Sequence, residues 1–86
     1  MEQIPLSTLP LGACAKIVQV RAGGDMARRL ADLGFVPGTA VECALISPAG
    51  DPAAYRLRGS LIALRRQDAG CIAVSPAAPP GGEDSI

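Results

Sequence analysis

The sequence has no histidine and no tryptophan, and its aromatic residues are one phenylalanine, Phe35, and one tyrosine, Tyr55. Without histidine the commonest general base is missing, and no serine has an evident activating partner, so we do not expect an enzyme. Two aromatic residues are also too few to line a groove for proline-rich peptides or to stack on the bases of a nucleic acid.

Net charge is absent as well, since eight basic residues balance eight acidic ones. Residues 1–75 hold all eight basic and six of the acidic residues, a net charge of +2, which is too small for a nucleic-acid-binding surface. No apolar run reaches the roughly 18 residues of a membrane-spanning helix. We therefore expect neither nucleic-acid binding nor membrane insertion.

The three cysteines, Cys14, Cys43 and Cys71, are odd in number and widely spaced, which argues against a disulfide framework and favours the reducing cytoplasm. A zinc site needs convergent nitrogen and sulfur ligands, but the chain has no Cys-x-x-Cys pair and no histidine. We expect no required cofactor and no dedicated metal site. Cys14 and Cys71 are the candidates for adventitious binding of a divalent metal at the surface.

Residues 1–12 are punctuated by Pro5 and Pro10, which predicts an extended leading segment whose leucines, Leu6, Leu9 and Leu11, lie against the domain without a regular element. The run Leu11-Gly12-Ala13-Cys14 is similar to a lipoprotein cleavage site. The residues before it carry no lysine or arginine, which a secretory signal requires, so we expect no signal peptide.

One helix is predicted, over Asp25–Leu33. Asp25 is a good N-cap residue, and an apolar stripe recurs at i, i+4 and i+7 in Met26, Leu30 and Leu33. Gly34 stands where a left-handed residue ends a helix, with Phe35 following to pack as in a Schellman motif. The pair Pro37-Gly38 then predicts a type II turn.

Strands are predicted where Ile, Val and Leu alternate with smaller or polar residues. In the second strand, Val41, Cys43 and Leu45 alternate with Ala40, Glu42 and Ala44, which places Cys43 in the core. Ile17 and Val20 do not share one face of the first strand, which predicts a bulge between them. The five strand segments are Cys14–Arg21, Thr39–Ile46, Ala54–Arg58, Ser60–Arg65 and Cys71–Ser75.

Five short strands, with one short helix between the first and second, predict a mainly β fold, a small five-stranded barrel. Gly59 predicts a tight bend or bulge between the third and fourth strands. We expect one domain over residues 1–75. Residues 76–86 are rich in proline, glycine and acidic residues and bury too little apolar surface to order themselves, so we expect disorder there.

Three motifs in this order resemble the ferrous iron transport protein A (FeoA) family. The first is the run from Arg29 to Gly38, the second is Gly50-Asp51-Pro52, and the third is Gly59 followed by Leu61–Arg66. The resemblance covers residues 4–75 and implies an SH3-like barrel. Its motif positions serve turns and core: Leu30, Leu33, Gly34, Pro37, Gly38 and Gly59.

This resemblance implies a cytoplasmic accessory protein that binds and modulates a large membrane ferrous-iron transporter with a GTP-binding domain. The same domain is similar to the C-terminal domain of iron-dependent repressors, so the alternative is a metal-responsive regulatory domain. We expect a monomer or a weak homodimer.

Four arginines are the candidate partner-binding residues. Arg28 and Arg29 lie on the predicted helix, and Arg56 and Arg58 lie on a predicted strand. Arginine is enriched at protein interfaces and suits planar contacts with carboxylates. The other interpretation is an ordinary solvated face.

Overall fold

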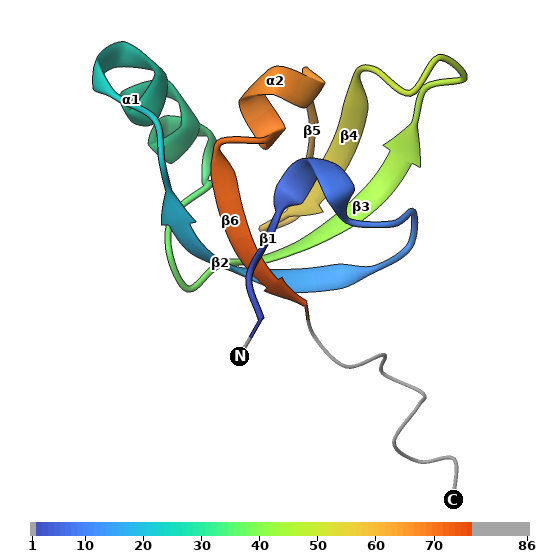
Figure 1. Ribbon diagram of the computed structural model, residues 1–86, viewed down its shortest axis with the longest axis horizontal. Helices are drawn as coiled ribbons and strands as arrows, with labels where there is room; N and C mark the ends of the chain where they lie inside the picture. The colour runs from blue at the N-terminus through green and yellow to red at the C-terminus, as the bar shows by residue number, and fades with distance from the viewer. Residues whose placement is uncertain (1, 77–86) are drawn as a thin grey trace, which may run out of the picture.

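The computed structural model describes residues 2–76 of the chain (Figure 1). In chain order the elements of this part are β1 (Ile4–Pro5), the 3-10 turn η1 (Leu6–Thr8), β2 (Cys14–Val20), α1 (Gly24–Leu33), β3 (Ala40–Ile46), β4 (Ala53–Leu57), β5 (Ser60–Leu64), α2 (Arg66–Ala69) and β6 (Ile72–Pro76). No helix among residues 2–76 has the length and apolar character needed to cross a membrane.

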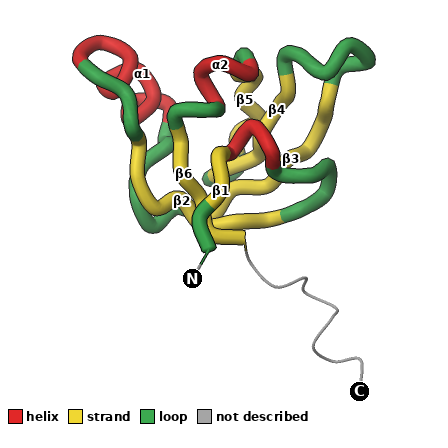
Figure 2. The backbone as a smooth tube through the Cα atoms, in the orientation of Figure 1, coloured by secondary structure: helices red, strands yellow, loops and turns green. Residues whose placement is uncertain are grey.

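The strands form one antiparallel sheet in the order β1-β6-β2-β3-β4-β5, so β1 and β5 are its edges. The sheet curls around a single core as a small open barrel, with α1 at one end and α2 and η1 over the opening (Figures 1 and 2). The predicted mainly β barrel is confirmed, and its one predicted helix lies between the first two predicted strands. The short strand β1 and the short helix α2 were not predicted.

The core consists of aliphatic side chains around the two aromatic residues, and both Phe35 and Tyr55 are buried. Because these are the only aromatic residues of the chain, no aromatic side chain is left to line a peptide-binding groove. The predicted burial of Cys43 is confirmed. The other large, fully buried side chains are Leu6, Ile17, Leu30, Ile72, Val41 and Val74.

Helix α1 begins one residue earlier than predicted, and its N-cap is Gly23 rather than Asp25. Gly24 has a positive φ of 53°, which turns the chain into the helix, and Asp25 lies in the first turn without a capping hydrogen bond. Its carboxylate still faces the positive end of the helix dipole. Of the predicted apolar stripe, Leu30 is buried and Leu33 is exposed, because the helix covers only the rim of the barrel.

The end of α1 is the Schellman motif that the sequence predicts. Gly34 is left-handed and donates its N–H to the carbonyl of Ala31 at 3.0 Å, while Phe35 donates to the carbonyl of Leu30 at 2.9 Å. The type II turn follows, with Gly38 at a φ of 93° and a 3.1 Å hydrogen bond from Thr39 to Val36. These bonds aim Phe35 into the core.

The leading segment is more regular than predicted. Strand β1 pairs with β6, and η1 then buries Leu6 and Leu9. Leu11, expected to lie against the barrel, is 61% exposed, because the chain turns outward after Pro10. Proline at position 5 is tolerated because β1 is an edge strand.

Two bulges shape the sheet. The first lies between Ile17 and Gln19 of β2, as predicted. The second, between Cys43 and Leu45 of β3, was not predicted. The extra residue reverses the side-chain alternation, so Leu45, expected in the core, is 57% exposed.

The ends of two strands, β4 and β6, differ by one residue from the predicted boundaries. Strand β6 includes Pro76, one residue beyond the predicted domain boundary. Arg58 lies in the turn after β4 rather than on the strand itself. The predicted disorder of the remaining tail concerns residues 77–86, which lie outside the described residues.

Candidate partner-binding surface

The outer face of β3, β4 and β5 carries an apolar strip. Tyr55 and Leu57 of β4 and Leu64 of β5 point into the core. By alternation, the residues next to them along each strand point outward. The strand register places Leu45, Ala54 and Ala63 in one row across the three strands. The next row holds Glu42, Arg56 and Leu61.

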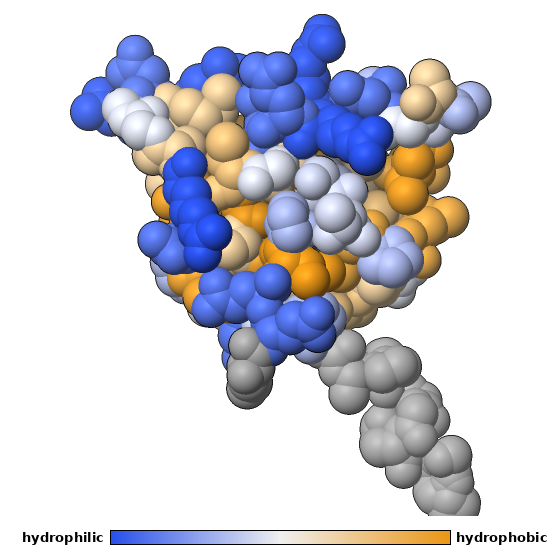
Figure 3. Space-filling view, viewed as in Figure 1, coloured by the Kyte–Doolittle hydropathy of each residue, from blue (hydrophilic) through white to orange (hydrophobic). Residues whose placement is uncertain are grey.

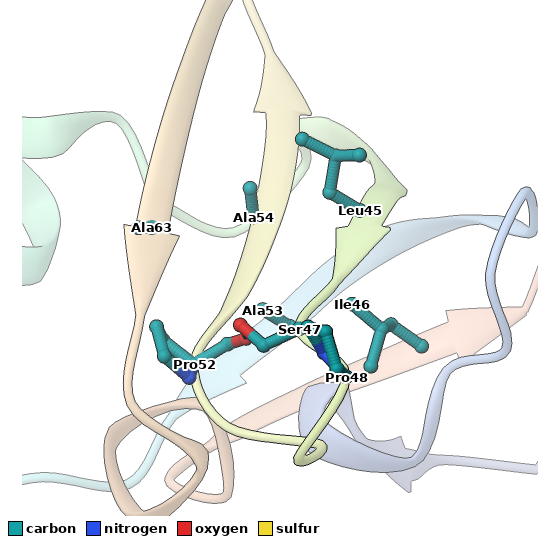
Figure 4. A pocket seen from close by; sticks show the side chains of 8 residues that line it. All are labelled: Leu45, Ile46, Ser47, Pro48, Pro52, Ala53, Ala54 and Ala63. Carbon is teal, nitrogen blue, oxygen red and sulfur yellow. Dashed lines mark hydrogen bonds between the residues drawn. The ribbon is translucent and has the colours of Figure 1, made fainter.

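A groove of about 310 Å³ lies at one end of this strip. Leu45 and Ile46 line it from β3, the strands β4 and β5 contribute alanines, and the loop between β3 and β4 closes one side with Pro48 and Pro52 (Figure 4). Figure 3 shows apolar surface at the right-hand edge of the molecule, over the end of β3. The complete lining is Leu45, Ile46, Ser47, Pro48, Pro52, Ala53, Ala54 and Ala63.

Two hydrogen bonds that involve side chains help to hold the loop that closes the groove. Ser47 donates its hydroxyl to the carbonyl of Pro52 at 2.6 Å, across the base of the loop. Asp51 accepts the backbone N–H of Arg66 at 2.9 Å, which caps the first turn of α2. The groove wall is therefore fastened both to itself and to the element that follows β5.

Arg56 and Arg58 border a second hollow, of about 240 Å³, together with Cys14 and Glu42. Arg56 donates to the Glu42 carboxylate at 3.2 Å, and the two side chains are 55% and 35% exposed, so solvent screens this pair and it contributes little stability. Arg58 has a positive φ of 52° in the two-residue turn between β4 and β5. The structure thus brings these two predicted arginines to one hollow.

Arg28 and Arg29 are exposed on α1, as an interface role requires. Arg58 lies near the end of this helix, where a Cβ added at Gly34 would be 3.5 Å from the Cδ atom of Arg58. The two arginines of the helix have no ion pair among residues 2–76.

Cys14 and Cys71 do not converge. Cys14 begins β2 opposite Glu42, whereas Cys71 hydrogen-bonds through its carbonyl to Arg21, just beyond the other end of that strand. Among residues 2–76 no three cysteine, aspartate or glutamate side chains gather as a metal-binding group would require. The two predicted thiols therefore cannot share one ion.

Two buried groups have altered acidity. Burial raises the pKa of the Cys43 thiol, and the neighbouring Glu42 carboxylate raises it further. Burial also raises the pKa of the Tyr55 hydroxyl, with smaller contributions from Cys43 and Asp51. Both groups stay neutral near pH 7 and serve the core rather than chemistry.

Sequence reasoning missed two parts of this surface. It gave no role to Arg65 and Arg66, although they follow β5 at the end opposite to Arg58. It also missed the groove, because the bulge that turns Leu45 outward has no signal in the alternation of β3.

A family model for the FeoA domain matches residues 4–76, which is nearly the whole of the described structure. The chain belongs to the FeoA domain family. A curated relative from Porphyromonas gingivalis is 38% identical over 69 residues and is an Fe(2+) transport protein A/Fe(2+) transporter FeoB fusion protein. The match takes in 80% of this chain but only 8% of that relative's length, so the chain spans less than a tenth of the fusion protein.

Solved structures confirm the fold of this FeoA domain. The FeoA protein from Chlorobium tepidum is 36% identical, with a TM-score of 0.82 over 87% of this chain and 71% of that one. FeoA from Stenotrophomonas maltophilia, described as a prokaryotic SH3 domain protein complexed with zinc, is 35% identical, with a TM-score of 0.73 over 81% and 87% of the two chains. The SH3-like fold that the resemblance implies is therefore confirmed.

A manganese-dependent transcriptional repressor has the same fold, with a TM-score of 0.79, but is only 14% identical over 87% of this chain and 42% of its own. This similarity concerns the fold alone.

Proposed function

We propose that this FeoA domain is an accessory protein of ferrous iron uptake that binds the membrane ferrous-iron transporter through the transporter's cytoplasmic, GTP-binding part and modulates it. In this proposal the protein works in the cytoplasm, needs no cofactor and catalyses no reaction. Its contribution is to dock, as a monomer or weak homodimer, on the transporter.

The observation that carries the proposal is the fusion protein from Porphyromonas gingivalis, in which a relative of this domain and a ferrous-iron transporter form one polypeptide. Fusion places the two parts at a high effective concentration, which suits partners that also associate when they are separate chains. The exposed arginines and the apolar groove of this chain supply interface chemistry.

The test is a calorimetric titration of the chain with the soluble GTP-binding part of the transporter from the same organism. We expect saturable one-to-one binding, weakened by the double substitution Arg28→Glu and Arg29→Glu. The matched control is Lys16→Glu with Arg21→Glu, which makes the same charge change on exposed residues of β2 and its end. Equal affinity of the two double variants would remove Arg28 and Arg29 from the interface.

The metal-responsive regulatory domain stays the second candidate. It predicts tight, stoichiometric binding of a divalent metal ion by the isolated chain. The separation of Cys14 from Cys71 does not support it, because among residues 2–76 neither thiol belongs to a group of three possible metal ligands, and a closed site needs four.

A further inference from the structure

Strand β5 is an edge with a free row of backbone groups. Within the described residues 2–76 it pairs with β4 alone, through a two-residue turn that closes on Leu57 and Ser60. In an antiparallel hairpin of this kind the hydrogen-bonded pairs alternate from the turn outward, so Ser60, Ile62 and Leu64 bond to β4. The N–H and C=O groups of Leu61 and Ala63 therefore point away from the sheet.

Nothing among residues 2–76 covers this row with backbone contacts. Outside the ladder to β4, no backbone hydrogen bond of that part of the chain reaches Leu61 or Ala63. Leu61 is 52% exposed, and Ala63 is exposed as well. The edge is therefore free to accept another strand.

Strand β5 also lacks the usual protection of an edge. Its sequence, Ser-Leu-Ile-Ala-Leu, contains no proline, glycine, charged residue or bulge. Natural sheets normally block a free edge with one of these devices, because an apolar edge pairs with other strands. An unprotected edge in a small domain is a candidate site for β-strand addition.

The apolar groove continues the same surface. Ala63 belongs both to the free edge and to the groove lining, and the row Ala63, Ala54 and Leu45 leads from one to the other. A strand added to β5 would therefore meet apolar side chains on the outer face of the sheet. Those contacts suit apolar residues at alternate positions of the added segment.

The charged residues that flank β5 indicate which kind of segment would pair with it. Arg58 precedes β5, and Arg65 with Arg66 follows it, so three arginines flank the edge, with the carboxylates of Asp51 and Asp68 beside Arg66. A second copy of the chain fits poorly in the register centred on Ile62, because the turn residue Arg58 of one copy would then lie at the same end as Arg66 of the other. Like charges directly opposite one another destabilise a sheet. Carboxylates at the ends of the added strand would complement all three arginines.

We propose that the free edge of β5 receives an extended segment of a partner protein that is apolar at alternate positions and acidic at its ends. The proposal rests on the partner-binding function above and names its mode: main-chain hydrogen bonds to Leu61 and Ala63, side chains toward the groove, and carboxylates on Arg58, Arg65 and Arg66.

The test is amide hydrogen exchange of the full chain, free and with the transporter's GTP-binding part, resolved by residue. We expect the Leu61 and Ala63 amides to exchange rapidly in the free chain and to become protected in the complex. A complex in which both amides stay unprotected would overturn the edge proposal and leave the proposed function intact. Failure to form any complex would overturn both. Protection that instead appears with rising concentration of the chain alone would assign the edge to a second copy.

Two substitutions in β5 test the backbone and the side-chain contacts of the edge separately. Ala63→Pro removes an N–H that points away from β4, so the ladder survives while the added strand loses a donor. Leu61→Glu places a negative charge where an acidic, apolar segment would lie. Each is expected to weaken binding about tenfold. The matched control for the second is Leu11→Glu, at another exposed leucine, which should leave binding unchanged. Equal effects of Leu61→Glu and Leu11→Glu would contradict the proposal.

Discussion

Asp51 accepts a hydrogen bond from the backbone N–H of Arg66 at 2.9 Å, and this bond ties the loop between β3 and β4 to the first turn of α2. It is the link between the wall of the apolar groove and the segment that follows the free edge. Asp51→Ala leaves that N–H without its partner and is expected to cost about 1 kcal/mol of unfolding free energy. Asp51→Asn keeps an oxygen acceptor and should cost less. Urea unfolding measures both, and equal losses would show that the acceptor is unimportant.

Gly34 ends α1 in a left-handed backbone conformation that directs the next residue into the core. Its φ of 109° is strained for any other residue, while an added Cβ would meet Leu57 and Arg58 only at ordinary contact distances of 3.5 Å. We expect Gly34→Ala to destabilise the fold by about 1–2 kcal/mol through backbone strain. The control is Gly70→Ala, because Gly70 has a helical φ of −65° and should be neutral or slightly stabilised. Thermal unfolding that ranks the two variants the other way would contradict this account.

Arg58 occupies a position that favours asparagine or glycine. Its positive φ of 52°, followed by Gly59 at 80°, defines a type I′ turn. Arg58→Asn is expected to raise the unfolding free energy by about 0.5–1 kcal/mol. The same change at Arg56, which has strand geometry, should bring no such gain. If Arg58 contacts the partner, its replacement will also weaken transporter binding. A more stable variant with unchanged affinity would exclude Arg58 from the interface.

Alkaline pH should lower the stability of the fold through two buried acidic groups, the Cys43 thiol and the Tyr55 hydroxyl. The ordinary pKa values are 9.0 for Cys43 and 10.0 for Tyr55, and both are raised in the folded state, chiefly by burial. The unfolded chain therefore loses these protons first, so their contribution to stability is complete below about pH 9 and falls as the pH rises further. Unfolding free energies measured from pH 7 to pH 10.5 should be flat and then decline, less steeply for Tyr55→Phe. Constant stability across this range would contradict the assignment.

Local chemistry made the segment around α1 predictable. Gly34, Phe35 and the Pro37-Gly38 pair act through their own backbone preferences, so the helix end, the buried ring and the turn could be derived without knowledge of the fold. Helix α1 begins one residue earlier than predicted because Gly24, with its positive φ, already turns the chain into the helix.

Features that depend on distant partners could not be derived in this way. Strand β1 exists because it pairs with β6, about seventy residues away in the chain. Leu45 faces outward because β3 bulges against β4, and α2 receives its cap from Asp51. The apolar strip, the groove and the free edge all depend on such long-range relations. Of the candidate partner-binding surface, the sequence therefore predicted only the arginines.

The central claim is that this FeoA domain acts by binding a protein partner rather than a metal ion. The most direct measurement is anaerobic calorimetry of the reduced chain with two titrants, Fe²⁺ and the GTP-binding part of the transporter. The account predicts saturable one-to-one binding of the transporter part and no Fe²⁺ binding below millimolar concentrations. Micromolar one-to-one binding of Fe²⁺, with no heat from the transporter part, would contradict it and would make the chain a metal-responsive domain.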